Sequence, residues 1–287
     1  MMAANRRPKK WCVDLMWQTM KTAGSSSFTP HPRQDIADRQ GLVRDAARDV
    51  AAVAALVVLA ALAALGLAGS AGLGVGYVLK AVLVFAAGSW LVWRALGSHP
   101  HARFGPANRV TLARLGAMAL MAALLGEALP RAPLHAMPAA AWWLVSAATL
   151  TALLDAVDGA LARRSGLASA FGARFDMETD AAFTLVLCAL VLQAGQAGVW
   201  ILASGLMRYA FVAAAFAWPW LNGPLPPSKR RQTVCVVQIT TLIVCLGPTV
   251  PPWLASGLAA VSLVLLTLSF ATDVRTLARR RPTPLET

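Results

Sequence analysis

The sequence predicts an all-α fold, a polytopic membrane helical bundle in which a hairpin of two helices precedes a core of six. Of the 287 residues, 57% are hydrophobic and only 14% are charged, and the mean hydropathy is +0.59. A soluble domain carries about 25% charged residues, so the composition excludes a soluble enzyme. The charged residues also gather in short clusters between long uncharged segments, as they do in proteins that cross a membrane several times.

The distribution of charge divides the chain into four regions. We expect a basic, partly disordered cytoplasmic arm, a transmembrane hairpin, a six-helix transmembrane domain that carries the activity, and a cytoplasmic basic tail, over residues 1–49, 50–96, 104–274 and 275–287. A spanning helix needs about 20 apolar residues. The segments that meet this need are 50–68, 74–93, 110–129, 139–161, 176–194, 199–221, 232–247 and 253–272.

Basic residues lie almost entirely at one set of helix ends. That set includes Arg44, Arg94, Arg164 and Arg275, whereas the opposite set carries only Arg131. Because basic residues stay on the cytoplasmic side of a membrane, we expect both termini to be cytoplasmic. The chain has 26 Lys and Arg against 13 Asp and Glu, a net charge of +13. These charges follow helix ends and form no single face, so they do not predict nucleic-acid binding.

Four aspartates lie close together at the predicted membrane boundary: Asp155, Asp158, Asp176 and Asp180. An aspartate at mid-membrane costs roughly 2.5–3.5 kcal/mol to insert, so such residues usually have a function. The first pair is spaced i, i+3 and the second i, i+4, so each pair shares one face of its helix. Gly159 and Ala162 continue the stripe of Asp155 and form a notch in which a bulky ligand can reach the backbone.

Two antiparallel helices carrying these pairs would bring four like charges together. Such a group requires protonation or divalent cations. Carboxylate oxygens suit Mg²⁺ or Mn²⁺, and two such ions can clamp the attacking and leaving oxygens of a phosphoryl transfer. The pattern therefore indicates a diphosphate substrate. The alternative is that the aspartates only pair with arginines at the helix ends, namely Arg163, Arg164 and Arg174.

Residues 155–180 read D-x2-D-G-x2-A-R-x8-G-x3-D-x3-D. This motif resembles the signature of the CDP-alcohol phosphatidyltransferase family, and the helices predicted from residue 108 onward resemble the family's six-helix layout. The resemblance implies transfer of a phosphate-linked alcohol from a CDP-alcohol, in bacterial members commonly CDP-diacylglycerol, to a second alcohol with release of CMP in phospholipid biosynthesis. It also implies two divalent cations and a place in the bacterial inner (cytoplasmic) membrane, with the active site on the cytoplasmic side.

The resemblance assigns roles to individual residues. The metal ligands would be Asp155, Asp158, Asp176 and Asp180, and Asp180 would also be the catalytic proton acceptor. The CDP-alcohol would lie against Asn108, Thr111, Gly159, Ala162, Arg163, Ser169 and Gly172. Residues 108–114 resemble the family's Pro-Asn-x-x-Thr-x-x-Arg motif, but Ala107 here separates Pro106 from Asn108, which weakens the transfer of roles to Asn108 and Thr111. Arg114 would face the carboxylates or extend to the headgroups.

The acceptor site is indicated less directly. Arg208 lies in the middle of a predicted span, where extension to the headgroups is strained, and Lys229, Arg230 and Arg231 follow at a helix end. In family members with phosphorylated acceptors, basic residues in this region meet the acceptor's phosphate. We therefore expect Arg208, Lys229 and Arg230 to bind a phosphorylated polyol such as glycerol 3-phosphate, while serine and choline stay open as acceptors.

Two other functions fit parts of the pattern. A membrane prenyltransferase would need a second aspartate cluster on another helix pair, which the sequence lacks. A transporter that uses the aspartates as cation or proton sites would be expected to show internal repeats, and we find no repeat between the halves of this chain. We expect a homodimer among membrane lipids, with the CDP-alcohol donor and the small alcohol acceptor as its substrates.

Overall fold

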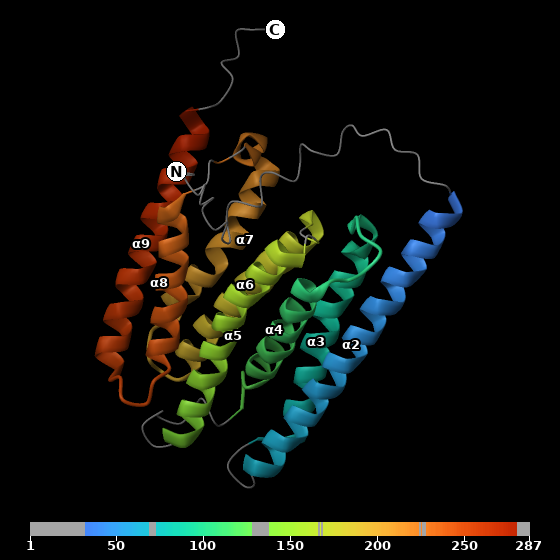
Figure 1. Cartoon of the computed structure of the whole chain (residues 1–287). Coiled ribbons are helices and arrows are strands. Elements are labelled where there is room, and N and C mark those ends of the chain that lie inside the picture. The colour runs from blue at the N-terminus through green and yellow to red at the C-terminus, as the bar shows by residue number, and fades with distance from the viewer. Residues whose placement is uncertain are drawn as a thin grey trace, which may run out of the picture.

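The computed structural model describes residues 32–68, 73–127, 138–165, 167, 169–223, 225 and 228–279. Within these residues the protein is helical and contains no strand, so the predicted all-α fold is confirmed. The long helices are α2 (Pro32–Ala68), α3 (Val75–Ala95), α4 (Pro106–Ala123), α5 (Pro138–Ser165), α6 (Ala170–Gln193), α7 (Leu202–Ala217), α8 (Lys229–Cys245) and α9 (Pro252–Arg279). They form one bundle in which the chain runs from α2 at one side to α9 at the other (Figure 1).

Helix α2 begins earlier than the sequence predicts. It starts at Pro32, inside the predicted arm, and continues without interruption into the apolar span. Proline is well suited to the first position of a helix, and Leu42 and Ala46, spaced i, i+4, are buried on its inner face. The polar residues of 32–49 therefore extend a membrane helix as its charged end. The rest of the predicted arm, residues 1–31, lies outside the described residues.

Within the described residues, five helical segments are long and apolar enough to cross a membrane: Asp38–Gly66, Val75–Ser98, Pro138–Ala162, Val199–Ala217 and Pro252–Arg279. They fit an integral membrane protein. The helices α4, α6 and α8, which the sequence also predicts as spans, fall below this threshold. Charged residues contribute to this in α4 and α6, for example Arg114 and Asp180, and α8 has only 17 residues.

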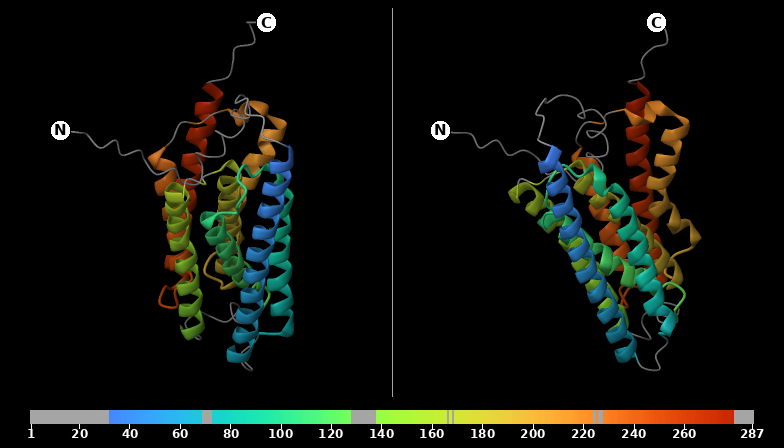
Figure 2. Two further views of the ribbon diagram at one scale, coloured as in Figure 1. Left: turned by 45° about the vertical axis from the view of Figure 1, so that its right-hand side comes forward. Right: turned by 90° about the vertical axis from the view of Figure 1, so that its right-hand side faces the viewer.

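Helix α4 lies at the centre of the N-terminal half, in contact with α2, α3, α5 and α6. Helix α6 joins the two halves because it also contacts α7 and α8, and α8 packs along α9. The axes of the helices are broadly aligned in both views of Figure 2. Fully buried side chains from α4, α6 and α8, among them Leu112, Phe183, Leu187 and Leu242, fill the space between them. The polar faces of α4, α5 and α6 are thereby held against one another.

The N-terminal hairpin packs against α4 through small residues. An added Cβ at Gly116 would lie 3.0 Å from side-chain carbons of Val53 and Val57, and one at Gly88 would lie 2.7 Å from the side chain of Leu115. Small residues of this kind let membrane helices approach closely. The sequence left open whether the hairpin packs on the core, and the structure shows that it does.

Gly205 sets the distance between α6 and α7. A Cβ at this position would lie 2.7 Å from the backbone Cα of Leu185, so α7 would have to move. We expect Gly205→Ala to lower the free energy of unfolding by about 1–3 kcal/mol, seen as a lower melting temperature in detergent. Gly257→Ala is the control, because its Cβ would meet nothing within 4 Å on α9 and alanine favours helix by up to about 1 kcal/mol. Equal shifts of the two melting temperatures would contradict this account.

Candidate active site

Three helices converge on one buried guanidinium group. Arg114 lies on α4, and its side chain is only 1% exposed. Helices α5 and α6 face it with the two aspartate pairs of the signature motif. All of these aspartates contact the guanidinium: Asp155, Asp158, Asp176 and Asp180. The structure thus brings together the four acids that the sequence singled out, and it turns Arg114 toward them and away from the headgroups.

The carboxylates divide between the two terminal nitrogens of Arg114. Its Nη1 lies 3.1 Å from Asp155 Oδ1, 2.9 Å from Asp158 Oδ2 and 2.6 Å from Asp176 Oδ1. Its Nη2 contacts Asp180 Oδ1. Four carboxylates exceed the single positive charge of Arg114, so the cluster favours the binding of further cations.

Three of the aspartates form a group that fits a metal ion. Oxygens of Asp155, Asp158 and Asp176 all lie within 4.8 Å of one another. The Asp158 side chain is buried, whereas those of Asp155 and Asp176 are 16% and 33% exposed. Carboxylate oxygens are the hard ligands that Mg²⁺ and Mn²⁺ prefer, and the partial exposure leaves space for oxygens of water or substrate. The donor set therefore fits a divalent cation.

Residues of α4 connect the carboxylates to the beginning of α6. The Thr111 hydroxyl group lies 3.1 Å from Asp158 Oδ2 and donates a hydrogen bond to it. One turn earlier, Asn108 packs so closely on Gly172 that a Cβ there would lie 2.7 Å from Asn108 Oδ1. Ser169 begins α6 by accepting a hydrogen bond from the Gly172 backbone N–H at 3.0 Å. These four residues, all predicted to bind the donor, therefore lie along one path beside the acids.

The Asn108 amide also contacts the segment that precedes α4. Its Nδ2 donates to the Phe104 carbonyl oxygen and lies 3.1 Å from His99 Nε2. The other ring nitrogen, His99 Nδ1, accepts a hydrogen bond from the His101 backbone N–H at 3.1 Å, and burial lowers the pKa of His99. The position of Asn108 is therefore fixed from both sides.

The remaining residues predicted for the donor lie on α5 after the first aspartate pair. Gly159 and Ala162 are partly exposed on this helix, on the same stripe as Asp155. Arg163 follows in the same helix, and its side chain lies outside the described residues. The stripe of small residues next to the acids is thus accessible.

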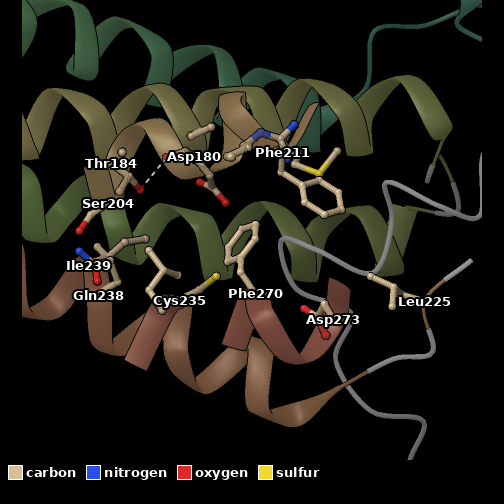
Figure 3. A pocket seen from close by; sticks show the side chains of 15 residues that line it. Asp180, Thr184, Ser204, Phe211, Leu225, Cys235, Gln238, Ile239, Phe270 and Asp273 are labelled. Atoms are coloured by element: carbon tan, nitrogen blue, oxygen red, sulfur yellow. Dashed lines mark hydrogen bonds between the residues drawn. The ribbon is translucent and has the colours of Figure 1, made fainter. Parts of the chain in front are cut away.

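A cavity of about 110 Å³ adjoins the acids between α6, α7, α8 and α9. Asp180 points into it from α6 (Figure 3). Arg208 also lines it from α7, and its Nη2 lies 2.6 Å from Glu178 Oε1. Asp180 is the only aspartate of the signature among the described residues that line this cavity. It therefore differs from the other three in facing a second space.

Of the other basic residues indicated for the acceptor site, two contact a residue that lines this cavity. Arg230 contacts Asp273 on α9, with its Nη2 2.6 Å from Asp273 Oδ1, and Asp273 lines the cavity. Arg231 is buried and contacts the same carboxylate oxygen at 3.1 Å. Lys229 is exposed at the start of α8. The structure thus brings Arg208 to the cavity and Arg230 to its rim, and leaves Lys229 on the surface.

Sequence reasoning missed polar residues of the cavity, among them Thr184, Ser204, Gln238 and Asp273. The signal that could have found them is the same one that found the aspartates, since each interrupts an apolar run. What the sequence does not give is which face of each helix turns to the cavity.

The comparison with protein families matches residues 105–272 to the family described as CDP-alcohol phosphatidyltransferase. This range is more than half of the chain. It begins just before α4 and ends within α9, so it contains the whole acid cluster and leaves out the hairpin of α2 and α3. Comparisons with curated proteins and with solved structures gave no match.

Proposed function

The chain belongs to the CDP-alcohol phosphatidyltransferase family, and from this membership we propose that it transfers a phosphatidyl group from CDP-diacylglycerol to an acceptor alcohol and releases CMP. The observation that carries the proposal is the convergence of four carboxylates on Arg114, beside a cavity that Asp180 lines. The family match favours this reaction over the transporter that the sequence left as an alternative.

In the proposed reaction the acceptor's hydroxyl oxygen forms a bond to the phosphorus atom that carries diacylglycerol. The bond from that phosphorus to the bridging oxygen of the diphosphate breaks, and CMP leaves with this oxygen. Asp180 takes up the hydroxyl proton. A carboxylate that faces the cavity is within reach of a hydroxyl group bound there, as a general base requires, and this supports the role of Asp180.

We propose that Asp155, Asp158, Asp176 and Asp180 hold two divalent cations, Mg²⁺ or Mn²⁺. When bound, such ions supply the positive charge that neutralises the phosphate oxygens during transfer. The protein's own part is to keep the ligands in position. Arg114 contacts all four carboxylates, and Thr111 donates a hydrogen bond to Asp158.

The CDP part of the donor is proposed to lie over the small residues of α5. Gly159 and Ala162 leave the helix backbone accessible next to the acids, and Arg163 follows them as a partner for phosphate oxygens. Asn108 at the start of α4, and Ser169 and Gly172 at the start of α6, would contact the donor at the same site. Because the basic clusters of the sequence lie at this end of the helices, we propose that the reaction takes place at the cytoplasmic face of the bacterial inner membrane.

The test is an assay of the purified full-length protein in detergent. CDP-diacylglycerol is supplied with glycerol 3-phosphate, inositol phosphate, serine or choline, in Mg²⁺, Mn²⁺ or EDTA, and CMP is measured. We expect CMP release that requires both an acceptor and a divalent cation. Absence of CMP with every acceptor in both ions contradicts the proposed reaction. CMP release with serine or choline alone keeps the reaction and overturns the phosphorylated acceptor.

We propose that the acceptor is a phosphorylated polyol whose phosphate group binds Arg208. A hydrogen bond to a charged group contributes about 1.5–3 kcal/mol, so we expect Arg208→Gln to raise the KM for glycerol 3-phosphate by about tenfold or more and to change kcat less. Arg208→Lys should restore part of the affinity. The control is Arg275→Gln, an exposed arginine on α9. A KM that is the same in both glutamine variants would contradict the role of Arg208.

A further inference from the structure

One end of the cavity holds two polar side chains that have no role in the proposed reaction. Ser204 from α7 and Gln238 from α8 lie together at this end, while Asp273 from α9 lies at the other (Figure 3). Asp180 points into the cavity between the two ends. The end formed by Ser204 and Gln238 therefore lies in the same cavity as the proposed reacting group.

Both side chains are buried, and neither makes a hydrogen bond within the described part of the chain. Ser204 is 5% exposed and Gln238 is 3% exposed. The Ser204 hydroxyl and both the oxygen and the nitrogen of the Gln238 amide have no partner there. Buried polar groups are nearly always hydrogen-bonded, and leaving them unpaired destabilises the fold. Polar residues inside a membrane bundle that carry this penalty usually serve a function.

The chemistry of the two groups identifies what they can bind. The amide of Gln238 offers donors and an acceptor, and the hydroxyl of Ser204 offers one donor and accepts as well. Neither is charged, and Figure 3 shows the uncharged residues Thr184 and Ile239 next to them. An ammonium or carboxylate group would find no counter-charge in this set. An alcohol hydroxyl group both donates and accepts hydrogen bonds, so it can pair with Ser204 and Gln238.

We propose that Ser204 and Gln238 bind a second hydroxyl group of the acceptor, one that does not react, and thereby select a polyol over a mono-alcohol. The inference rests on the proposed function and specifies the acceptor further. Arg208, Asp180 and the pair Ser204–Gln238 all line one cavity. Each then meets a different part of the acceptor: the phosphate group, the reacting hydroxyl group and the second hydroxyl group.

The test compares two acceptors that differ by that hydroxyl group alone. Glycerol 3-phosphate carries it, and 3-hydroxypropyl phosphate keeps the phosphate group and the reacting hydroxyl group without it. We expect the unmodified protein to prefer glycerol 3-phosphate by about tenfold or more in kcat/KM, since a site built for a hydroxyl group rejects the analogue that lacks it. Gln238→Leu should raise the KM for glycerol 3-phosphate by about tenfold, leave kcat/KM for the analogue unchanged, and so remove the preference. Ser204→Ala should also reduce the preference for glycerol 3-phosphate.

Thermal unfolding separates this role from a structural one. Gln238→Leu replaces an unpartnered buried amide by an apolar group of similar size, so the melting temperature should stay the same or rise. If the amide of Gln238 supported the fold, its replacement would lower the melting temperature. Gln40→Leu, on the exposed side of α2, is the matched control and should change neither the preference nor the KM.

The inference would be overturned if the unmodified protein used both acceptors equally well. It would also be overturned if Gln238→Leu and Ser204→Ala both kept the preference for glycerol 3-phosphate. The third contrary result is an equal loss of kcat/KM with both acceptors, accompanied by a lower melting temperature. In each of these cases CMP release with glycerol 3-phosphate would still stand as support for the transferase. If only serine or choline supports CMP release, the polyol site is wrong and the transferase is retained. If no acceptor gives CMP, the proposed function fails as well.

Discussion

Asp180→Asn is expected to reduce the rate of CMP release by about 10²- to 10⁴-fold, the range that a positioned general base contributes. The amide keeps the shape of the side chain and cannot accept the acceptor's proton. The other three acids still form the group whose oxygens lie within 4.8 Å. Stabilisation of the protein by Mg²⁺ against heat should therefore persist in this variant while turnover is lost.

The measurement is the single-turnover rate of CMP release with saturating donor and acceptor, together with the shift of melting temperature by Mg²⁺. Asp38→Asn serves as the control, because Asp38 is exposed near the start of α2, and its rate should equal that of the unmodified protein. A normal rate in Asp180→Asn would show that another group accepts the proton. Loss of both turnover and Mg²⁺ stabilisation would show that metal binding by the cluster depends on Asp180.

Arg114→Gln is expected to lower the free energy of unfolding in EDTA by about 3–5 kcal/mol, the cost of removing one partner from a buried ionic group. The guanidinium is 1% exposed and contacts all four acids. Without it, the carboxylates repel one another in a buried site. Because Mg²⁺ supplies positive charge to the same carboxylates, it should raise the melting temperature of Arg114→Gln more than that of the unmodified protein.

Arg109 offers a matched control on the same helix. Its side chain is 53% exposed and its Nε lies 2.8 Å from Asp49 Oδ2, an exposed pair of the kind that contributes roughly 0–1 kcal/mol. Arg109→Gln should therefore melt within a few degrees of the unmodified protein in EDTA and in Mg²⁺ alike. Equal melting temperatures for Arg114→Gln and Arg109→Gln in EDTA would show that the acids do not depend on Arg114 for their charge balance.

The acid cluster was the most predictable part of the site. Its residues lie on two consecutive helices, where spacing alone fixes which side chains share a face, and the short connection makes those faces meet. For Arg114 the sequence left two orientations open, toward the carboxylates or toward the headgroups. One arginine a short way inside a span can extend to the headgroups or turn inward, and the choice depends on helices that arrive later in the chain.

The cavity was not predictable from the sequence. It is formed by α6, α7, α8 and α9, and its polar residues are single interruptions of apolar runs, so no spacing relates Ser204 to Gln238. The early start of α2 was missed for a different reason. Hydropathy marks where a helix enters apolar surroundings, and the charged residues of 32–49 continue the same helix outside them.

The hairpin of α2 and α3 lies outside the range that matches the family, yet it rests on the helix that carries Arg114 and Thr111. Val53 and Val57 press on Gly116, two residues beyond that arginine. The appended segment therefore supports the helix that carries the arginine around which the acids are arranged, and a substitution at Val53 or Val57 would change the packing two residues from Arg114.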